Sequence, residues 1–255
     1  MKKIIYVIAI ACVAVLAVNS CKKGDPQDPG SKKRLAMCGD EWDKYHFFYN
    51  ADGSIKEMKR NYDDETQTWE KIWVFTWNGN KGSAKLFEGE LQIAELEFGL
   101  NGQGFIEKYV DRWGDEYKCT YDLEGHLLKI FRVKDSQDIL KSTLVWEGGN
   151  LIKWSRIVEG GEEQFKNQSF LEVKNEGGIC PDFPDSDKAG IDRWLYEAGL
   201  MGKPSKLLMD QAAWTGSEAI AVHTYTKDSD GFVTKVSKVY GTDDPELYYY
   251  QWELK

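Results

Sequence analysis

Histidine is the side chain most often used for proton transfer near neutral pH and for binding transition metals. The chain has three, His46, His126 and His223, and they are scattered among different expected hairpins. No two of them have metal-ligand spacing, and neither H-E-x-x-H nor C-x-x-C occurs. The sequence therefore predicts no metal centre, no cofactor and no catalytic histidine. Each histidine is expected to be exposed or hydrogen-bonded within a strand.

Nucleophilic and carboxylate chemistry also lack a signature. No G-x-S-x-G occurs, and no His/Asn constellation marks a cysteine nucleophile. The 42 acidic residues would allow the carboxylate pair that glycoside hydrolysis needs, but their spacing selects no pair. Asp185 and Asp187 are better interpreted as helix-capping residues. We therefore expect that the protein is not an enzyme.

The cysteines divide into two groups. Cys12 and Cys21 belong to the amino-terminal region, which leaves Cys38, Cys119 and Cys180, an odd number. At most one disulfide can form within the chain, and the sequence does not select it; Cys38 with Cys180 is our working pairing. Cys119 lies between Tyr117 and Tyr121 and is expected in the core.

The ten tryptophans are the one compositional excess. Strand alternation gives two aromatic rows: Tyr248, Tyr250 and Trp252 in one, and Trp73, Phe75 and Trp77 in the other. Aromatic pairs across strands stabilise sheets, so packing is the favoured interpretation. A platform for sugar rings and the wall of an apolar cavity are the alternatives.

These residues are carried by a repeated hairpin, best seen at residues 121–130 (YDLEGHLLKI). Most copies have Asn or Asp three residues before a glycine, which starts a type I turn that the left-handed glycine closes. Their glycines are Gly53, Gly104, Gly125, Gly149 and Gly231. With a degenerate copy at Asn78-Gly79 included, the copies from Gly53 to Gly149 recur roughly every two dozen residues.

A ligand-binding glycine loop is disfavoured. Gly99, Gly102 and Gly104 do not match G-x-G-x-x-G, and no Lys-Ser or Lys-Thr follows. The run from Asp228 to Gly231 lacks the spacing and the distal Glu of a calcium loop.

The repeats predict a mainly β protein: an antiparallel β-meander of hairpins curled into an open or partial barrel. One helix is expected near residues 186–199, because Ile191, Trp194, Leu195 and Ala198 recur at helical spacing. Its apolar face is expected to lie against the sheet and close the core. A lid over a cavity is the alternative.

The amino terminus predicts an export signal. Lys2 and Lys3 precede an apolar run over residues 4–18, and residues 16–21 (LAVNSC) resemble a bacterial lipobox. The resemblance implies cleavage before Cys21 and lipidation of Cys21; an ordinary signal peptide with an incidental cysteine is the alternative. We divide the chain into a signal peptide (1–20), a flexible tether (21–33) and a single β-meander domain (34–255).

The charge of the mature chain limits its partners. Removing Lys2 and Lys3 from 33 basic residues leaves 31 against 42 acidic residues, a formal charge of −11. Such an acidic chain argues against nucleic acid and against a basic patch that binds anionic lipid. The membrane partner is therefore expected through the lipid on Cys21.

The repeated Y-x-Y-D-x-x-G-x-L-x-x-I hairpins, the lipobox, the irregular break at residues 177–184 and the single helix resemble a Bacteroidetes lipoprotein family. That family is a domain of unknown function described as having a porin-like β fold, and the resemblance covers about residues 34–255. It implies an outer-membrane-anchored domain, on the periplasmic face or the cell surface, and supplies no catalytic residues. We interpret "porin-like" as a curved sheet, because charged residues alternate along the strands.

Three hypotheses follow. The leading one is a non-enzymatic cell-envelope lipoprotein that binds a glycan or a protein. The second is a periplasmic carrier that holds an apolar ligand inside the curved sheet. The third is an envelope hydrolase. A carrier needs an unfilled apolar cavity, a glycan binder an exposed aromatic row, and a hydrolase two close carboxylates in a cleft.

Overall fold

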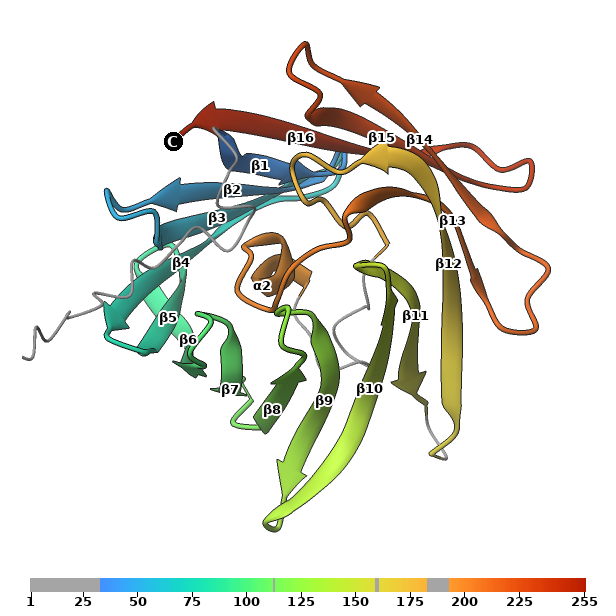
Figure 1. Cartoon of the computed structure of the whole chain (residues 1–255). Coiled ribbons are helices and arrows are strands. Elements are labelled where there is room, and N and C mark those ends of the chain that lie inside the picture. The colour runs from blue at the N-terminus through green and yellow to red at the C-terminus, as the bar shows by residue number, and fades with distance from the viewer. Residues whose placement is uncertain (1–32, 112, 159–160, 183–192) are drawn as a thin grey trace, which may run out of the picture.

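The described residues form one closed β-barrel around a short helix (Figure 1). The computed structural model describes residues 33–111, 113–158, 161–182 and 193–255. Each of the sixteen strands pairs antiparallel with its neighbours in sequence. The strands are β1 (Lys33–Gly39), β2 (Asp43–Tyr49), β3 (Ile55–Asp63), β4 (Thr68–Asn78), β5 (Lys81–Glu88), β6 (Leu91–Leu100), β7 (Ile106–Val110), β8 (Glu116–Tyr121), β9 (Leu127–Lys134), β10 (Gln137–Glu147), β11 (Asn150–Ile157), β12 (Glu163–Lys174), β13 (Leu207–Trp214), β14 (Ala221–Lys227), β15 (Val233–Tyr240) and β16 (Glu246–Leu254).

The barrel is closed, so the prediction of an open or partial barrel is wrong. β1 pairs with β16 from Lys33 opposite Leu254 to Gly39 opposite Tyr249. The Arg34 Nε also donates to Glu253 Oε1 at 2.7 Å across this seam. Closure satisfies both sheet edges, which hairpin repeats alone would leave unpaired. The repeats could not predict it, because they specify pairing between neighbours only.

The repeated turns have a common geometry. The φ angles of Gly53, Gly104, Gly125, Gly149 and Gly231 lie between 81° and 95°. In the Asp122 turn, Gly125 N donates to the Asp122 carbonyl at 3.2 Å and His126 N donates to Asp122 Oδ1 at 2.8 Å. Asp111 makes the same two hydrogen bonds, with Gly114 N and Asp115 N, which adds a copy of the turn that the sequence analysis did not identify. The Gly149 turn differs, because both Gly148 and Gly149 have positive φ in a two-residue loop.

Strand alternation makes the inside of the barrel the hydrophobic core. On β4, Trp73 and Phe75 are buried while Val74 and Thr76 are exposed. β6 repeats the pattern, with Leu96 buried between the exposed Glu95 and Glu97. Because residues two apart share a face, every strand sends one set of side chains into the interior.

The chain between β12 and β13 enters this interior, and we call its described part, residues 175–182 and 193–206, the inner segment. It contains α2 (Arg193–Glu197), which Figure 1 shows within the ring of strands. Backbone hydrogen bonds attach the inner segment to the hairpin ends. Lys203 N donates to the Gly125 carbonyl at 2.9 Å, and Lys206 N to the Gly149 carbonyl at 3.0 Å. The segment therefore has a defined position against the wall.

α2 covers only the end of the helix expected near residues 186–199. Residues 183–192, with Asp185, Asp187 and Ile191, lie outside the described residues. Gly199 follows with a φ of 71°, and Leu200 N donates to the Leu195 carbonyl at 2.9 Å, which ends the helix. Trp194, Leu195 and Ala198 are all buried in the core. Within the described ranges, no helix has the length and apolar character needed to cross a bilayer.

The three cysteines are buried thiols, and no disulfide joins them. The expected pairing of Cys38 with Cys180 is therefore wrong. Cys38 lies on β1, Cys119 on β8 and Cys180 in the inner segment, where each packs as a small apolar residue of the core. Burial raises the pKa of the Cys119 thiol to about 12, so this sulfur stays protonated and unreactive near neutral pH.

Candidate functional site

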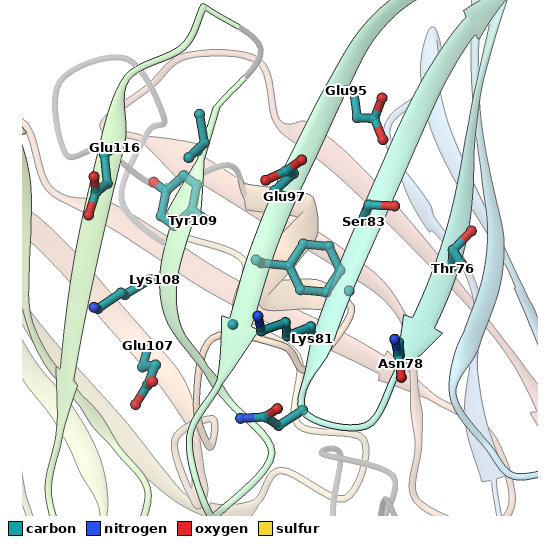
Figure 2. A pocket seen from close by; sticks show the side chains of 15 residues that line it. Thr76, Asn78, Lys81, Ser83, Glu95, Glu97, Glu107, Lys108, Tyr109 and Glu116 are labelled. Atoms are coloured by element: carbon teal, nitrogen blue, oxygen red, sulfur yellow. The ribbon is translucent and has the colours of Figure 1, made fainter.

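The outer face of β4–β8 carries an open depression of about 640 Å³, whose exposed lining is more apolar than polar (Figure 2). Its walls include four glutamates, on β6 to β8, and two lysines. The carboxylates of Glu95 and Glu97 stand on β6 in Figure 2, with Lys108 on the neighbouring β7. Nothing lies within 4 Å of the position that a Cβ on Gly99 would take, so the missing side chain leaves the depression open. Such a surface offers hydrogen bonds to a polar partner.

Catalysis by these carboxylates has little support. Glu95, Glu97, Glu107 and Glu116 are all exposed. A general acid in glycoside hydrolysis needs an apolar environment that keeps it protonated near neutral pH. The depression is therefore better suited to binding than to acid catalysis.

A second polar site lies inside the barrel, and we call it the inner charge cluster: Lys166, Gln168, Asp182, His223 and Lys238. All five are less than a tenth exposed. Lys166 Nζ lies 2.5 Å from Asp182 Oδ2, and Lys238 Nζ lies 3.6 Å from Asp182 Oδ1. Gln168 Nε2 donates to the Asp182 backbone carbonyl at 3.1 Å. One carboxylate of the inner segment is thus held by two ammonium groups.

Strand register explains why charged residues are buried here. Lys166 on β12 lies opposite Trp154, a core residue of β11. Lys238 on β15 is two residues after the buried Val236, so both point inward. His223 on β14 lies directly opposite Lys238. The same alternation that fills the interior with apolar side chains therefore gathers these polar ones.

The two lysines of the cluster have different pKa shifts. Burial lowers the pKa of Lys166, although the charge of Asp182 opposes the change, and the like charge of Lys238 adds to it. Burial also acts to lower the pKa of Lys238, but the attraction of Asp182 and a hydrogen bond with Tyr240 outweigh it, so this pKa is raised. Lys238 also has a second carboxylate, Glu246 Oε2, at 3.1 Å. Lys166 is therefore the more weakly compensated cation.

Besides Asp182 Oδ2, which meets Lys166 as an ion pair without a hydrogen bond, two polar atoms of the cluster have no hydrogen-bond partner among the described residues: His223 Nε2 and Gln168 Oε1. His223 is 2% exposed, and its Nδ1 lies 3.4 Å from the Asp210 carbonyl. Burial lowers the pKa of this histidine; the charge of Asp182 and the Asp210 carbonyl oppose the change, and the charges of Lys238 and Lys166 add to it, so the neutral ring predominates at pH 7. Buried polar groups are usually satisfied, so these two atoms mark unused binding capacity.

The histidines behave differently from one another. His126 is buried, its Nδ1 lies 2.8 Å from Asp122 Oδ2, and its ring stacks on Trp146. His46 on β2 is half-buried, and burial followed by the charge of Lys44 lowers its pKa. His223 departs from the prediction, since it is neither exposed nor fully hydrogen-bonded. In the described part of the chain, no group of three or more His, Cys, Asp or Glu residues could hold a metal ion.

The two aromatic rows face the interior rather than the solvent. Tyr250 is 2% exposed, and Trp252 Nε1 donates to the Val233 carbonyl at 2.7 Å. Trp77 Nε1 likewise donates to the Ile55 carbonyl at 2.7 Å. These rows therefore pack against the core and do not form an exposed platform for sugar rings.

Sequence reasoning missed Lys166, Asp182 and Lys238. A signal was present for Lys238, because it lies two residues after the apolar Val236 and therefore shares its strand face. Asp182 carries no such signal, since it lies on an irregular loop. Cys21, the expected lipidation site, lies outside the described residues.

Comparison with known proteins reveals similarity in fold alone. A porin-like protein from Bacteroides uniformis ATCC 8492 has a TM-score of 0.68 and 15% identity, covering 86% of this chain and 98% of that chain. A porin-like protein from Bacteroides vulgatus ATCC 8482 has a TM-score of 0.55 and 10% identity, covering 87% and 99%. No protein-family model and no curated protein matches the chain. The resemblance is thus confirmed for the porin-like β fold of Bacteroides.

Proposed function

We propose that this protein is a non-enzymatic binding module of the cell envelope, held at the outer membrane by a lipid on Cys21. Its partner, a glycan or a protein, binds the outer surface of the barrel. The observation that carries the proposal is the filled interior: Trp194 of α2 stacks on Trp73 of β4, with ring centroids 5.2 Å apart. A barrel packed in this way supports a surface-binding role better than transport through its centre.

The outer face supports the same proposal. Charged side chains such as Lys85, Glu95 and Glu97 point outward in the middle of strands. A barrel that inserts into lipid would present an apolar band there. The depression of Figure 2 combines an apolar lining with carboxylate, amide and hydroxyl groups, which can form hydrogen bonds with a partner.

The carrier hypothesis has less support, because the apolar interior near α2 is occupied by the inner segment. Phe75 also contacts Trp194, with ring centroids 5.8 Å apart. An apolar ligand would have to displace these side chains.

Binding at the depression can be tested by placing a photo-crosslinking amino acid at Ser83 on the intact lipidated protein in cells. Ser83 lines the depression, whereas the exposed Thr224 on β14 serves as the control position. We expect one discrete crosslinked product from Ser83 and none from Thr224. Equal crosslinking at both positions would contradict a binding surface on β4–β8.

The anchoring part is tested separately by Cys21→Ser. We expect the variant to leave the outer-membrane fraction, because the acyl chains are the proposed anchor. The wild type, reconstituted in planar bilayers, is expected to produce no conductance steps. A variant that still sediments with the outer membrane, or reproducible conductance from the wild type, would refute this part.

A further inference from the structure

We propose that the inner charge cluster is a carboxylate-binding site built into the barrel wall, which Asp182 occupies as an intramolecular ligand. This site lies inside the barrel and is independent of the outer depression. Its receptor residues come from three strands: Lys166 and Gln168 from β12, His223 from β14 and Lys238 from β15. The ligand comes from the inner segment.

The contacts match the recognition of a carboxylate. Each Asp182 oxygen has its own cation, Lys166 at 2.5 Å on Oδ2 and Lys238 at 3.6 Å on Oδ1. Gln168 holds the backbone carbonyl of the same residue. Neither contact is a hydrogen bond, because Asp182 Oδ2 makes none among the described residues and 3.6 Å is too long; both are ion pairs, whose attraction burial strengthens.

The positive charges that surround Asp182 favour an anion at its position. Without Asp182, the buried Lys166 ammonium would lose its carboxylate, and Lys238 would keep only Glu246, whose side chain is 48% exposed. Arg156 adds a third positive charge nearby, with its guanidinium 3.9 Å from the centroid of Trp214. Uncompensated buried cations are strongly unfavourable, so the wall favours any anion that fits.

Spare binding capacity is the second, independent observation. His223 Nε2 and Gln168 Oε1 are buried without a partner among the described residues. His223 Nδ1 faces the Asp210 carbonyl, so Nε2 of the neutral ring is a hydrogen-bond acceptor, as is Gln168 Oε1, and both can accept from a hydroxyl group. Two ammonium groups for a carboxylate, with two acceptors beside them, fit a small organic acid that also carries a hydroxyl group better than a spherical anion.

Asp182 has an advantage over any dissolved carboxylate because it is attached to the chain. An intramolecular ligand acts at an effective concentration in the millimolar range or above. Simple carboxylates are therefore expected to bind weakly to the wild type and clearly once the Asp182 side chain is removed.

The test is chemical rescue of Asp182→Ala in the full-length protein. Thermal unfolding is followed at pH 7.5 in sodium acetate and in sodium chloride of equal ionic strength. We expect the variant to melt well below the wild type in chloride. Each tenfold increase in acetate above its dissociation constant should raise the variant's Tm by about 3–5 °C. Asp182→Ser, which leaves a smaller gap, should respond in the same direction.

Three controls define the site. The wild type should not distinguish acetate from chloride. Asp43→Ala removes the partner of Arg60 from a more exposed pair, whose closest atoms are 2.6 Å apart, and should not be rescued. Lys166→Met combined with Asp182→Ala should lose most of the acetate response.

The proposal is overturned if acetate and chloride give equal Tm values for both Asp182 variants, or if neither variant folds even in acetate. Rescue by inorganic phosphate but not by acetate would overturn the carboxylate class. Equal rescue of Asp43→Ala would mean that acetate acts through the solvent.

Discussion

The interior of the barrel has two unlike regions, both contacted by the inner segment. Around α2, the segment meets β4 through stacked aromatic rings, with Trp194 against Trp73 and Phe75. Around Asp182, it meets β12 and β15 through buried charges. The first region is stabilised by apolar burial, which tolerates small shifts of position. The second depends on pairing, since a buried charge without its partner is strongly destabilising.

This difference shows how one inserted segment can be both held and positioned. Apolar contacts are non-directional and roughly proportional to buried area. Ion pairs and hydrogen bonds act only over short distances, so they define where Asp182 lies. Replacing a buried ion pair with apolar residues is often neutral or stabilising, which makes the charged region a poor device for stability alone. The presence of two buried lysines in this region therefore fits a binding role.

The largest effect is expected from the apolar region. Trp194→Ala should lower the free energy of unfolding by about 3–5 kcal/mol, because it removes a buried indole and leaves a cavity among Trp73 and Phe75. Urea unfolding followed by far-UV circular dichroism measures the change. Near-wild-type stability, together with uptake of a fluorescent fatty acid, would instead show that α2 is a lid.

A smaller effect is expected from the charged region. Asp182→Asn keeps the size of the side chain but removes the charge, and should lower the free energy of unfolding by about 1–3 kcal/mol. The apolar triple variant Lys166→Met, Asp182→Leu, Lys238→Met is the control. It should be close to the wild type or more stable, because no unpaired charge remains among the three. A triple variant less stable than Asp182→Asn would show that the charges stabilise the fold.

Gly125 lies in a turn of the barrel wall that the inner segment contacts. Its φ is 95°, a Cβ there would lie 2.8 Å from the Phe105 ring, and its carbonyl accepts from Lys203 N of the inner segment. Gly125→Val should lower the free energy of unfolding by more than about 1 kcal/mol, because a β-branched residue is strained at positive φ. Leu123→Val is the control, since Leu123 is fully exposed in the same turn. Equal urea midpoints for the two variants would refute this role of Gly125.

The smallest effect is the pH dependence contributed by the charged region. The pKa of His223 is lowered by burial, so below about pH 6.5 the unfolded chain binds a proton that the folded chain does not. The free energy of unfolding should therefore fall as the pH decreases from 7 to 5, by at most about 1.4 kcal/mol per pH unit from this residue.

His223→Gln should flatten that slope, as measured by urea unfolding at each pH. His46→Gln is the matched control: burial also lowers the pKa of His46, but this residue is only half-buried. If His46→Gln flattened the slope more than His223→Gln, the assignment to the charged region would be wrong.

Local pattern determined much of the fold. Asn or Asp three residues before a glycine predicted turns at Gly53, Gly104, Gly125 and Gly231, because side-chain oxygens and positive φ act within a few residues. Alternation predicted that Trp73, Phe75 and Trp77 share a face, and helical spacing predicted that Trp194 and Leu195 are buried together. These features need no contact between distant parts of the chain.

Contacts between distant residues decided the rest. Barrel closure joins β1 to β16, and the inner charge cluster joins strands β12 and β15 to Asp182 on a loop without regular structure. The sequence determined the faces of individual strands but not which faces meet across the interior. Barrel closure places one face of each strand inside and the other outside. As a result, two lysines on inward faces are buried next to one carboxylate.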